Sequence, residues 1–407
     1  MPCKFNIAMV TDYYFPSTGG IETHIRHLAK NLIQFGHKVI VITHRHTNME
    51  EAEEFQDIKV YKLNLPIVAC NTSFPSLYSN FHILKKIFEI ENIEIVHGHA
   101  TMSNLCLESL FHARTLNLKT VMTEHSIFEE GPFENVIVNS FSKFIFKTVD
   151  RCICVSKTSQ GNFIQRNCLP KNIVKVIPNA VKAENFYPNI NKPKGKVVII
   201  LSRLFYRKGI DLLIKAIPLI CQQDKEIKIL IAGEGPKRDE IEQIVDENQL
   251  SHRVQVFGEV KHQDAGKFLR QGDIFLNTSL TETFCLAILE ASMCGLHVVS
   301  TNVGGIHEVL PKELITFAKP TPEDLALKVI EKAADYDKQE ILKAYEKLKT
   351  KYSWKKVAQQ TVEIYREIEH RNMTISDRLG EYNSIFEHFL IILEYVWFYA
   401  ISIFCRK

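Results

Sequence analysis

The chain has 407 residues, of which 45% are hydrophobic and 24% are charged, which suits about two to three globular domains with buried cores. Its net charge of +3 is nearly neutral for this length and argues against a dedicated nucleic-acid-binding protein. The ten cysteines are scattered without zinc-binding spacing, which predicts reduced thiols in a reducing compartment.

Strand and helix patterns alternate through the first part of the chain. The apolar run within residues 4–10 is too short for a signal peptide and predicts a first strand, so we expect the catalytic part of the chain on the cytosolic side. A turn, "FPSTGG", leads into a helix with apolar residues at helical spacing. Later strands are predicted at "KVIVITH", "IEIVHGH", "KTVMTEH" and "RCICVSK". Strands interleaved with helices predict a parallel sheet covered on both faces.

A proline-rich linker, "IPNAVKAENFYPNINKPKGK", interrupts this alternation, which restarts at "KVVIILS". The sequence therefore predicts an α/β protein with two Rossmann-like lobes, at residues 1–182 and 183–370, and a ligand cleft between them beyond the carboxyl ends of the strands. The charged stretch from Lys338 to His370 is expected to be helical, to cover the second lobe and to provide a crossover helix.

The tail, residues 371–407, is predicted to associate with a membrane. Between Phe389 and Cys405 only Glu394 and Ser402 are polar. A helix of this length spans about 25 Å, against about 30 Å of bilayer core, so we predict a transmembrane or embedded helix at about 385–405. The alternative is a hydrophobic helix docked on the protein or on a partner. Glu394 argues against a simple span, because a charge at mid-depth usually faces a partner helix.

Two glutamates flank an apolar run in "SLTETFCLAILEASMCG". Thr283 and Phe284 are expected to begin a helix, whose free N–H groups would favour a phosphate. Glu282 and Glu290 could then accept hydroxyls of a hexose and of a ribose on either side of that phosphate. The alternative is a surface helix with solvated glutamates.

A basic loop, "SRLFYRKGID", contains Arg203, Arg207 and Lys208, cations that could bind a diphosphate. The alternative is a solvated surface loop. Gly19 and Gly20 could let backbone approach a ligand closely, or could simply form a tight turn. "AGEGPKRDE" lacks the third glycine and the later acidic residue of a dinucleotide site, which excludes a nicotinamide cofactor.

Three histidines, His97, His99 and His125, are expected to follow strands of the first lobe and to face the cleft. They could also be core histidines or part of a metal site. We expect no metal, because a third ligand is not evident and the Asp335–Asp337 pair lies in a charged helical region. In residues 136–151 the apolar side chains beside Lys143 and Lys147 predict either an amphipathic helix for lipid headgroups or core packing.

Together "DYYFPSTGGIETHI", "SRLFYRKGID", "GEGPKR" and "FLNTSLTETFCLAILEASMCGLHVVSTNVGGIHEVLP" resemble the nucleotide-sugar-dependent glycosyltransferases of the GT-B fold. Over roughly residues 5–370 the sequence more closely resembles the family of phosphatidylinositol N-acetylglucosaminyltransferase catalytic subunits. Much of the wider family has glycine where this chain has Cys285, whereas the closer family shares the cysteine.

This resemblance implies a retaining hexosyltransferase that moves N-acetylglucosamine from UDP-GlcNAc to phosphatidylinositol, the first step of glycosylphosphatidylinositol (GPI) anchor synthesis. It implies a multi-subunit complex on the cytoplasmic face of the endoplasmic reticulum membrane, with no cofactor and no metal requirement. The alternatives are a related GT-B transferase acting on another lipid, or a non-catalytic scaffold subunit that keeps the fold.

The resemblance also implies roles for matched residues. Arg203 and Lys208 would bind the diphosphate, and Glu290 would accept the ribose hydroxyls. Glu282 and His125 would lie against the donor sugar. The residues expected to bind substrate are Gly19, Gly20, His99, Thr283, Phe284 and Glu290.

Overall fold

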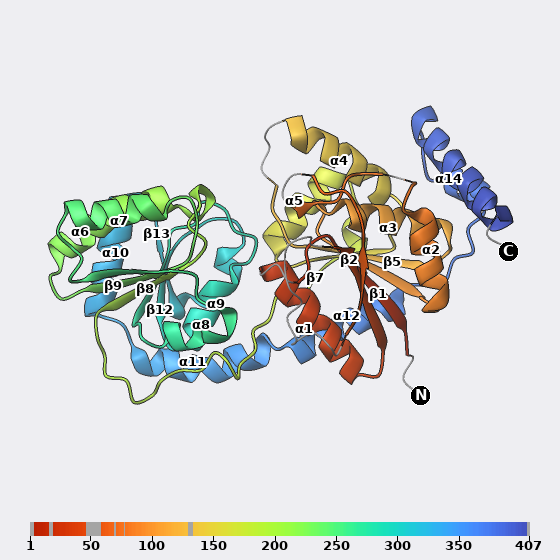
Figure 1. The fold of residues 1–407 in the computed structure, drawn as a ribbon. Helices are drawn as coiled ribbons and strands as arrows, with labels where there is room; N and C mark the ends of the chain where they lie inside the picture. Colours follow the sequence, from red (N-terminus) through yellow and green to blue (C-terminus); the bar gives the residue numbers. More distant parts are fainter. Residues whose placement is uncertain are drawn as a thin grey trace. The chain divides into compact units, whose positions relative to one another are not determined.

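The computed structural model describes residues 4–15, 19–45, 58–68, 71–76, 78–128 and 133–404. The chain forms two compact units (Figure 1), one made of Met1–Pro178 with Trp354–Lys407 and the other of Asn179–Ser353. The sequence placed residues 354–370 in the second lobe and treated 371–407 as a separate segment. In the structure both belong to the first unit, because their helices pack on elements of that unit.

The first unit is built on a seven-stranded parallel sheet with strand order β3-β2-β1-β4-β5-β6-β7. Its strands are β1 Asn6–Val10, β2 Lys38–His44, β3 Lys59–Leu63, β4 Ile95–His99, β5 Lys119–Glu124, β6 Arg151–Cys154 and β7 Val174–Val176. Its helices are α1 Gly20–Gln34, α2 Phe81–Ile90, α3 Asn104–Thr115, α4 Phe133–Phe146, α5 Lys157–Asn167, α12 Trp354–Glu367, α13 Ile375–Gly380 and α14 Ile385–Phe404. The central strands are buried along nearly their whole length, as a sheet covered on both faces requires.

Helix α12 returns the chain to the first unit and packs along α1. The hydroxyl of Tyr365 lies 2.6 Å from Nδ1 of His97 in β4. The indole of Trp354 stacks on the ring of His27 and meets that of His24 edge to face. The crossover helix is therefore part of the core of the first unit.

The second unit contains a six-stranded parallel sheet with strand order β10-β9-β8-β11-β12-β13. Its strands are β8 Val197–Leu201, β9 Lys228–Ala232, β10 Val254–Phe257, β11 Ile274–Asn277, β12 His297–Thr301 and β13 Ile315–Ala318. Its helices are α6 Ile210–Gln223, α7 Arg238–Glu247, α8 His262–Leu269, α9 Leu286–Met293, α10 Pro322–Ala334 and α11 Lys338–Lys351. The prediction of two Rossmann-like parallel sheets is confirmed.

Near its C-terminal end, helix α4 turns apolar side chains inward. Phe144, Ile145 and Phe146 are buried in the core of the first unit, while Lys143 and Lys147 are exposed. Core packing, rather than a lipid-facing stripe, therefore accounts for these apolar residues.

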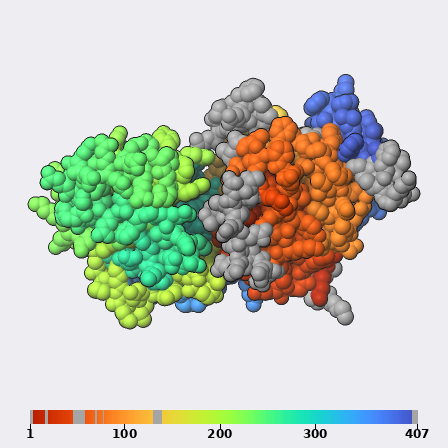
Figure 2. Space-filling model, in the orientation of Figure 1, coloured from red at the N-terminus to blue at the C-terminus, as the bar shows by residue number. Residues whose placement is uncertain are grey.

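The prediction of a transmembrane helix in the tail is wrong. Among the described residues, none of the helices combines the length and the apolar character that crossing a bilayer requires. Instead α14 packs on α3, and Figure 2 shows it in blue at the surface of the first unit. Ile391, Glu394 and Tyr395 are buried, and the Glu394 carboxylate lies 2.7 Å from Nδ1 of His112 in α3. The partner that Glu394 requires is thus in the same chain.

We predict that Glu394→Ala lowers the free energy of unfolding by about 2–4 kcal/mol, because it empties buried space and leaves the His112 imidazole without its partner. The control is Lys147→Ala, which removes a partly exposed pair with Glu387 and should cost less than about 1 kcal/mol. Urea denaturation followed by circular dichroism measures both. Equal losses would show that the buried pair does not hold α14.

Candidate functional site

The loop after β8 carries Lys208 and is joined by backbone contacts to the loop after β11. Gly209 has φ +67°, and a Cβ there would lie 1.8 Å from the carbonyl oxygen of Thr278. The Thr278 hydroxyl donates to the Lys208 carbonyl at 2.8 Å. Glycine is required here because the two backbones touch. Lys208 is consequently fixed against the segment that leads to Glu282.

Glu282 is held in the same way from its other side. The Gly305 N–H donates to the Glu282 carbonyl at 2.9 Å, and a Cβ on Gly304 would lie 1.9 Å from that oxygen. The Ser279 hydroxyl donates to Glu282 Oε1 at 2.9 Å, and Lys208 Nζ lies 2.5 Å from the same oxygen. Loops from three strands thus bring together an acid and a cation 74 residues apart.

Lys208 stays cationic in this setting. Burial pushes the pKa of its ammonium down, but the Glu282 carboxylate more than offsets this, so the pKa lies above its ordinary value. Arg203, which follows β8, is exposed, and its positive charge acts on Lys208 in the opposite direction. Arg203, Lys208 and Glu282 therefore form one electrostatic group within the second unit.

Glu290 lies in the second turn of α9 and is only 8% exposed. Among the described residues, no hydrogen bond or ion pair reaches its carboxylate. Burial raises its pKa to about 7. A buried carboxylate without a protein partner is costly, and a hydroxyl-bearing ligand would relieve that cost.

Helix α9 begins later than the sequence predicted. Thr283 and Phe284 lie in the preceding loop, and Leu286 is the first helical residue. The cause is Cys285, whose φ of +63° places it in the left-handed region and stops the helix from extending toward Thr283. Glycine would adopt this conformation with less strain than cysteine does.

Gly19 and Gly20 lie at the start of α1. Gly19 is extended, with φ −176°, and Gly20 is the first helical residue. A Cβ on Gly19 would lie 2.5 Å from Glu22 Oε2, the end of a flexible side chain. Glycine is therefore not strictly required at position 19, and the predicted role of both glycines in ligand binding stays a prediction.

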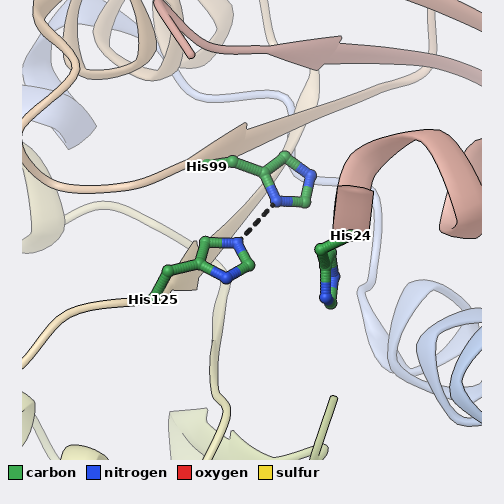
Figure 3. A group of neighbouring side chains, drawn as sticks. All are labelled: His24, His99 and His125. Atoms are coloured by element: carbon green, nitrogen blue, oxygen red, sulfur yellow. Dashed lines mark hydrogen bonds between the residues drawn. The ribbon is translucent and has the colours of Figure 1, made fainter. Parts of the chain in front are cut away.

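The histidines of the first unit separate into a core residue and a cluster. His97 and His99 lie inside β4 rather than after it. His97 is a core histidine, since its two ring nitrogens lie 2.6 Å from the Tyr365 hydroxyl and 2.7 Å from the Thr123 hydroxyl. His99 Nδ1 lies 3.2 Å from His125 Nε2 (Figure 3). Burial lowers the pKa of His99 and of His125 well below the ordinary value, so both imidazoles are neutral.

Sequence reasoning missed His24, which α1 directs toward this pair (Figure 3). Its ring centroid lies 4.7 Å from that of His125. His24 is four residues before Leu28 on the buried face of α1, which is the pattern that could have revealed it. His24, His99 and His125 are the one group in the described part of the chain whose ligand atoms could share a metal ion, all within 4.8 Å of one another.

We predict that Gly209→Ala lowers the free energy of unfolding by at least about 2 kcal/mol, because its Cβ meets backbone and its φ is unfavourable. The matched control is Gly161→Ala in α5, where nothing lies within 4 Å and alanine should stabilise by about 0.5–1 kcal/mol. Chemical denaturation measures the free energy of unfolding of both variants. An unchanged free energy of unfolding for Gly209→Ala would contradict the close approach of the two backbones.

We predict that Glu290→Gln stabilises the ligand-free protein at pH 8 by about 1–3 kcal/mol. The raised pKa means that the folded state prefers the neutral acid, so stability is lost as pH rises from about 4.5, the ordinary value, through about 7. The gain should therefore shrink at pH 5. The control is Glu363→Gln, at an exposed glutamate. A stability gain of Glu290→Gln that does not change with pH would contradict the burial of a titrating carboxyl.

Comparison with known proteins agrees with this architecture. The family model "Glycosyl transferases group 1" matches residues 181–349, and "Glycosyltransferase Family 4" matches residues 18–185. A solved glycosyltransferase from Rickettsia africae aligns with a TM-score of 0.73 at 21% identity, covering 89% of this chain and 98% of that one. The two units therefore have the GT-B glycosyltransferase fold.

Curated relatives are considerably more similar. The phosphatidylinositol N-acetylglucosaminyltransferase gpi3 subunit of Schizosaccharomyces pombe is 42% identical over 380 residues, which are 92% of this chain and 83% of that protein. A Homo sapiens subunit with the same transferase name is 41% identical over 366 residues, covering 88% of this chain and 75% of that protein. The chain therefore belongs to the family of these phosphatidylinositol N-acetylglucosaminyltransferase subunits.

Proposed function

We propose that this protein transfers N-acetylglucosamine from UDP-GlcNAc to phosphatidylinositol, the first step of GPI anchor synthesis. The observation that carries the proposal is the 42% identity, over 92% of the chain, to a protein that bears this transferase's name. The charged group of Arg203, Lys208 and Glu282, with the buried Glu290, supports a catalytic role over that of a scaffold that merely keeps the fold.

We assign the donor diphosphate to Arg203 and Lys208. Negative charge grows on the leaving UDP as the sugar–phosphate bond breaks, and fixed cations stabilise it without reorganisation. Lys208 is fixed by its loop and by Glu282, whereas Arg203 is exposed and able to adjust. These two cations supply the charge that a metal would otherwise provide, so we expect turnover without a metal.

The two glutamates are assigned to the sugar rings. Glu290 would accept hydrogen bonds from neighbouring ribose hydroxyls, which would satisfy its buried carboxylate. Lys208 and Ser279 both bind Oε1 of Glu282, so we assign Oε2 to a hexose hydroxyl. Thr283 and Phe284 would line the loop between them, with Phe284 held by its contact with the Tyr352 ring.

We expect the transfer to retain configuration. In a same-face attack the bond between the anomeric carbon and UDP breaks, the inositol hydroxyl oxygen bonds to that carbon, and the leaving phosphate takes the proton. No dedicated base is needed. His125, neutral through burial, would contribute a hydrogen bond beside the transferring sugar, with His99 behind it.

Because the acceptor is a lipid, the enzyme must act at a membrane surface. We propose that this surface is the cytoplasmic face of the endoplasmic reticulum membrane. Helix α14 supports this, because the face turned away from α3 is apolar and exposed. Its exposed apolar residues are Ile385, Phe386, Phe389, Ile392, Leu393, Val396, Trp397 and Tyr399. The relatives are named as subunits, so we expect the protein to act within a complex and some of this face to meet another protein of that complex.

We predict that Arg203→Ala and Lys208→Ala each reduce transfer at least about tenfold, since a lost phosphate contact raises the barrier by about 1.4 kcal/mol or more. Membranes containing the full complex are supplied with radiolabelled UDP-GlcNAc and phosphatidylinositol, and the labelled lipid is quantified. Lys215→Ala, an exposed lysine of α6, is the control.

Near-normal transfer by a folded Lys208→Ala variant would contradict the diphosphate assignment. A labelled product on another lipid would identify a different acceptor. The anomeric configuration of the product, read by NMR, tests retention.

A further inference from the structure

The cluster of His24, His99 and His125 has the composition of a metal site. The side chains come from three elements, α1, β4 and the loop after β5, and all three point toward one space (Figure 3). Three histidines with a fourth position left to water are a known zinc ligand set in proteins. We propose that these three histidines bind a divalent ion of the zinc class, with water completing a tetrahedral site.

The geometry of the pair at the centre fits such an ion. Two nitrogens bound to zinc at about 2.0 Å in a tetrahedron lie about 3.3 Å apart. His99 Nδ1 and His125 Nε2 are separated by 3.2 Å. An ion would take the place of the proton that they share, and that proton would move to the other nitrogen of the same imidazole. The separation of these two nitrogens thus already suits a tetrahedral ion, and a turn of each ring would aim its lone pair at the ion.

The third ligand, His24, needs a small movement to reach the ion. All three ligand atoms lie within 4.8 Å of one another, so an approach of about 1–1.5 Å by His24 would complete the set. A rotation of the His24 side chain, which packs edge to face against Trp354 and His125, would have to supply this movement. His97 is excluded as a ligand, because both of its ring nitrogens are engaged by the hydroxyls of Tyr365 and Thr123.

The chemistry of the cluster favours a borderline ion over a hard one. Imidazole nitrogen suits zinc, copper, nickel and cobalt, whereas magnesium and calcium prefer oxygen ligands. The group contains no carboxylate. His125 is only half-buried, which gives an ion and its water a route from solvent.

The test is titration of the purified full chain with Co²⁺ alone, followed by displacement with Zn²⁺. We expect the visible absorption bands of tetrahedral cobalt, saturating at one ion per chain. His24→Asn should weaken binding at least about tenfold, because losing a direct ligand costs no less than losing a partner behind it. His252→Asn, an exposed histidine outside the cluster, should bind as the unsubstituted chain does.

Absence of these bands, or equal binding by a folded His24→Asn variant, overturns the proposal. If that variant does not fold, crystals of the unsubstituted chain soaked in Zn²⁺ decide. An anomalous peak about 2.1 Å from the three nitrogens supports the site, and a peak elsewhere or none refutes it.

A bound ion should also slow the transfer reaction, a consequence that rests on the proposed function, in which His99 and His125 lie beside the donor sugar. Zinc should therefore inhibit transfer, and a chelator should restore it. Bound cobalt without inhibition would overturn the sugar assignment and leave the metal site intact. Normal transfer with no cobalt bands would overturn the metal site and leave the proposed function intact.

Discussion

The pairing of Lys208 with Glu282 is the contact that fixes the charged group of the second unit. Two carbonyl oxygens set it up, because Gly209 lies against Thr278 and Gly304 lies against Glu282 itself. Neither glycine could carry a side chain without separating the loops. Backbone packing at the ends of β8, β11 and β12 thus sets the positions of the Lys208 and Glu282 side chains.

Burial opposes the charged form of both Lys208 and Glu290. The ammonium of Lys208 remains charged because Glu282 is beside it, whereas the carboxyl of Glu290 has no such neighbour among the described residues and prefers its neutral form. In the proposed function, the stability cost of the buried Glu290 carboxylate is offset when ribose hydroxyls bind to it.

The sequence predicted the two parallel sheets and the convergence of Lys208 and Glu282, since buried parallel strands and glutamates beside apolar runs leave strong patterns. It placed the start of α9 three residues too early, because nothing in "TETFC" indicates that Cys285 adopts a left-handed conformation. The span of α14 was misjudged, and the sequence left α4 open between core packing and a lipid-facing surface, for one reason: apolar residues that face a core and those that face lipid have the same composition. His24 was missed because a histidine on an apolar helix face is ordinary unless the sheet beside it is known.

The return of the chain through α12 makes the second unit an insertion within the first. His97 lacks one of its two hydrogen-bond partners until Tyr365, 268 residues later, has been made. During synthesis the ribosome must therefore release almost the entire chain before the first unit can be completed, while the second unit, continuous from Asn179 to Ser353, has all its residues earlier. A nascent chain interrupted before Trp354 would have every residue of the second unit, but an N-terminal sheet in which His97 lacks the hydroxyl that α12 supplies.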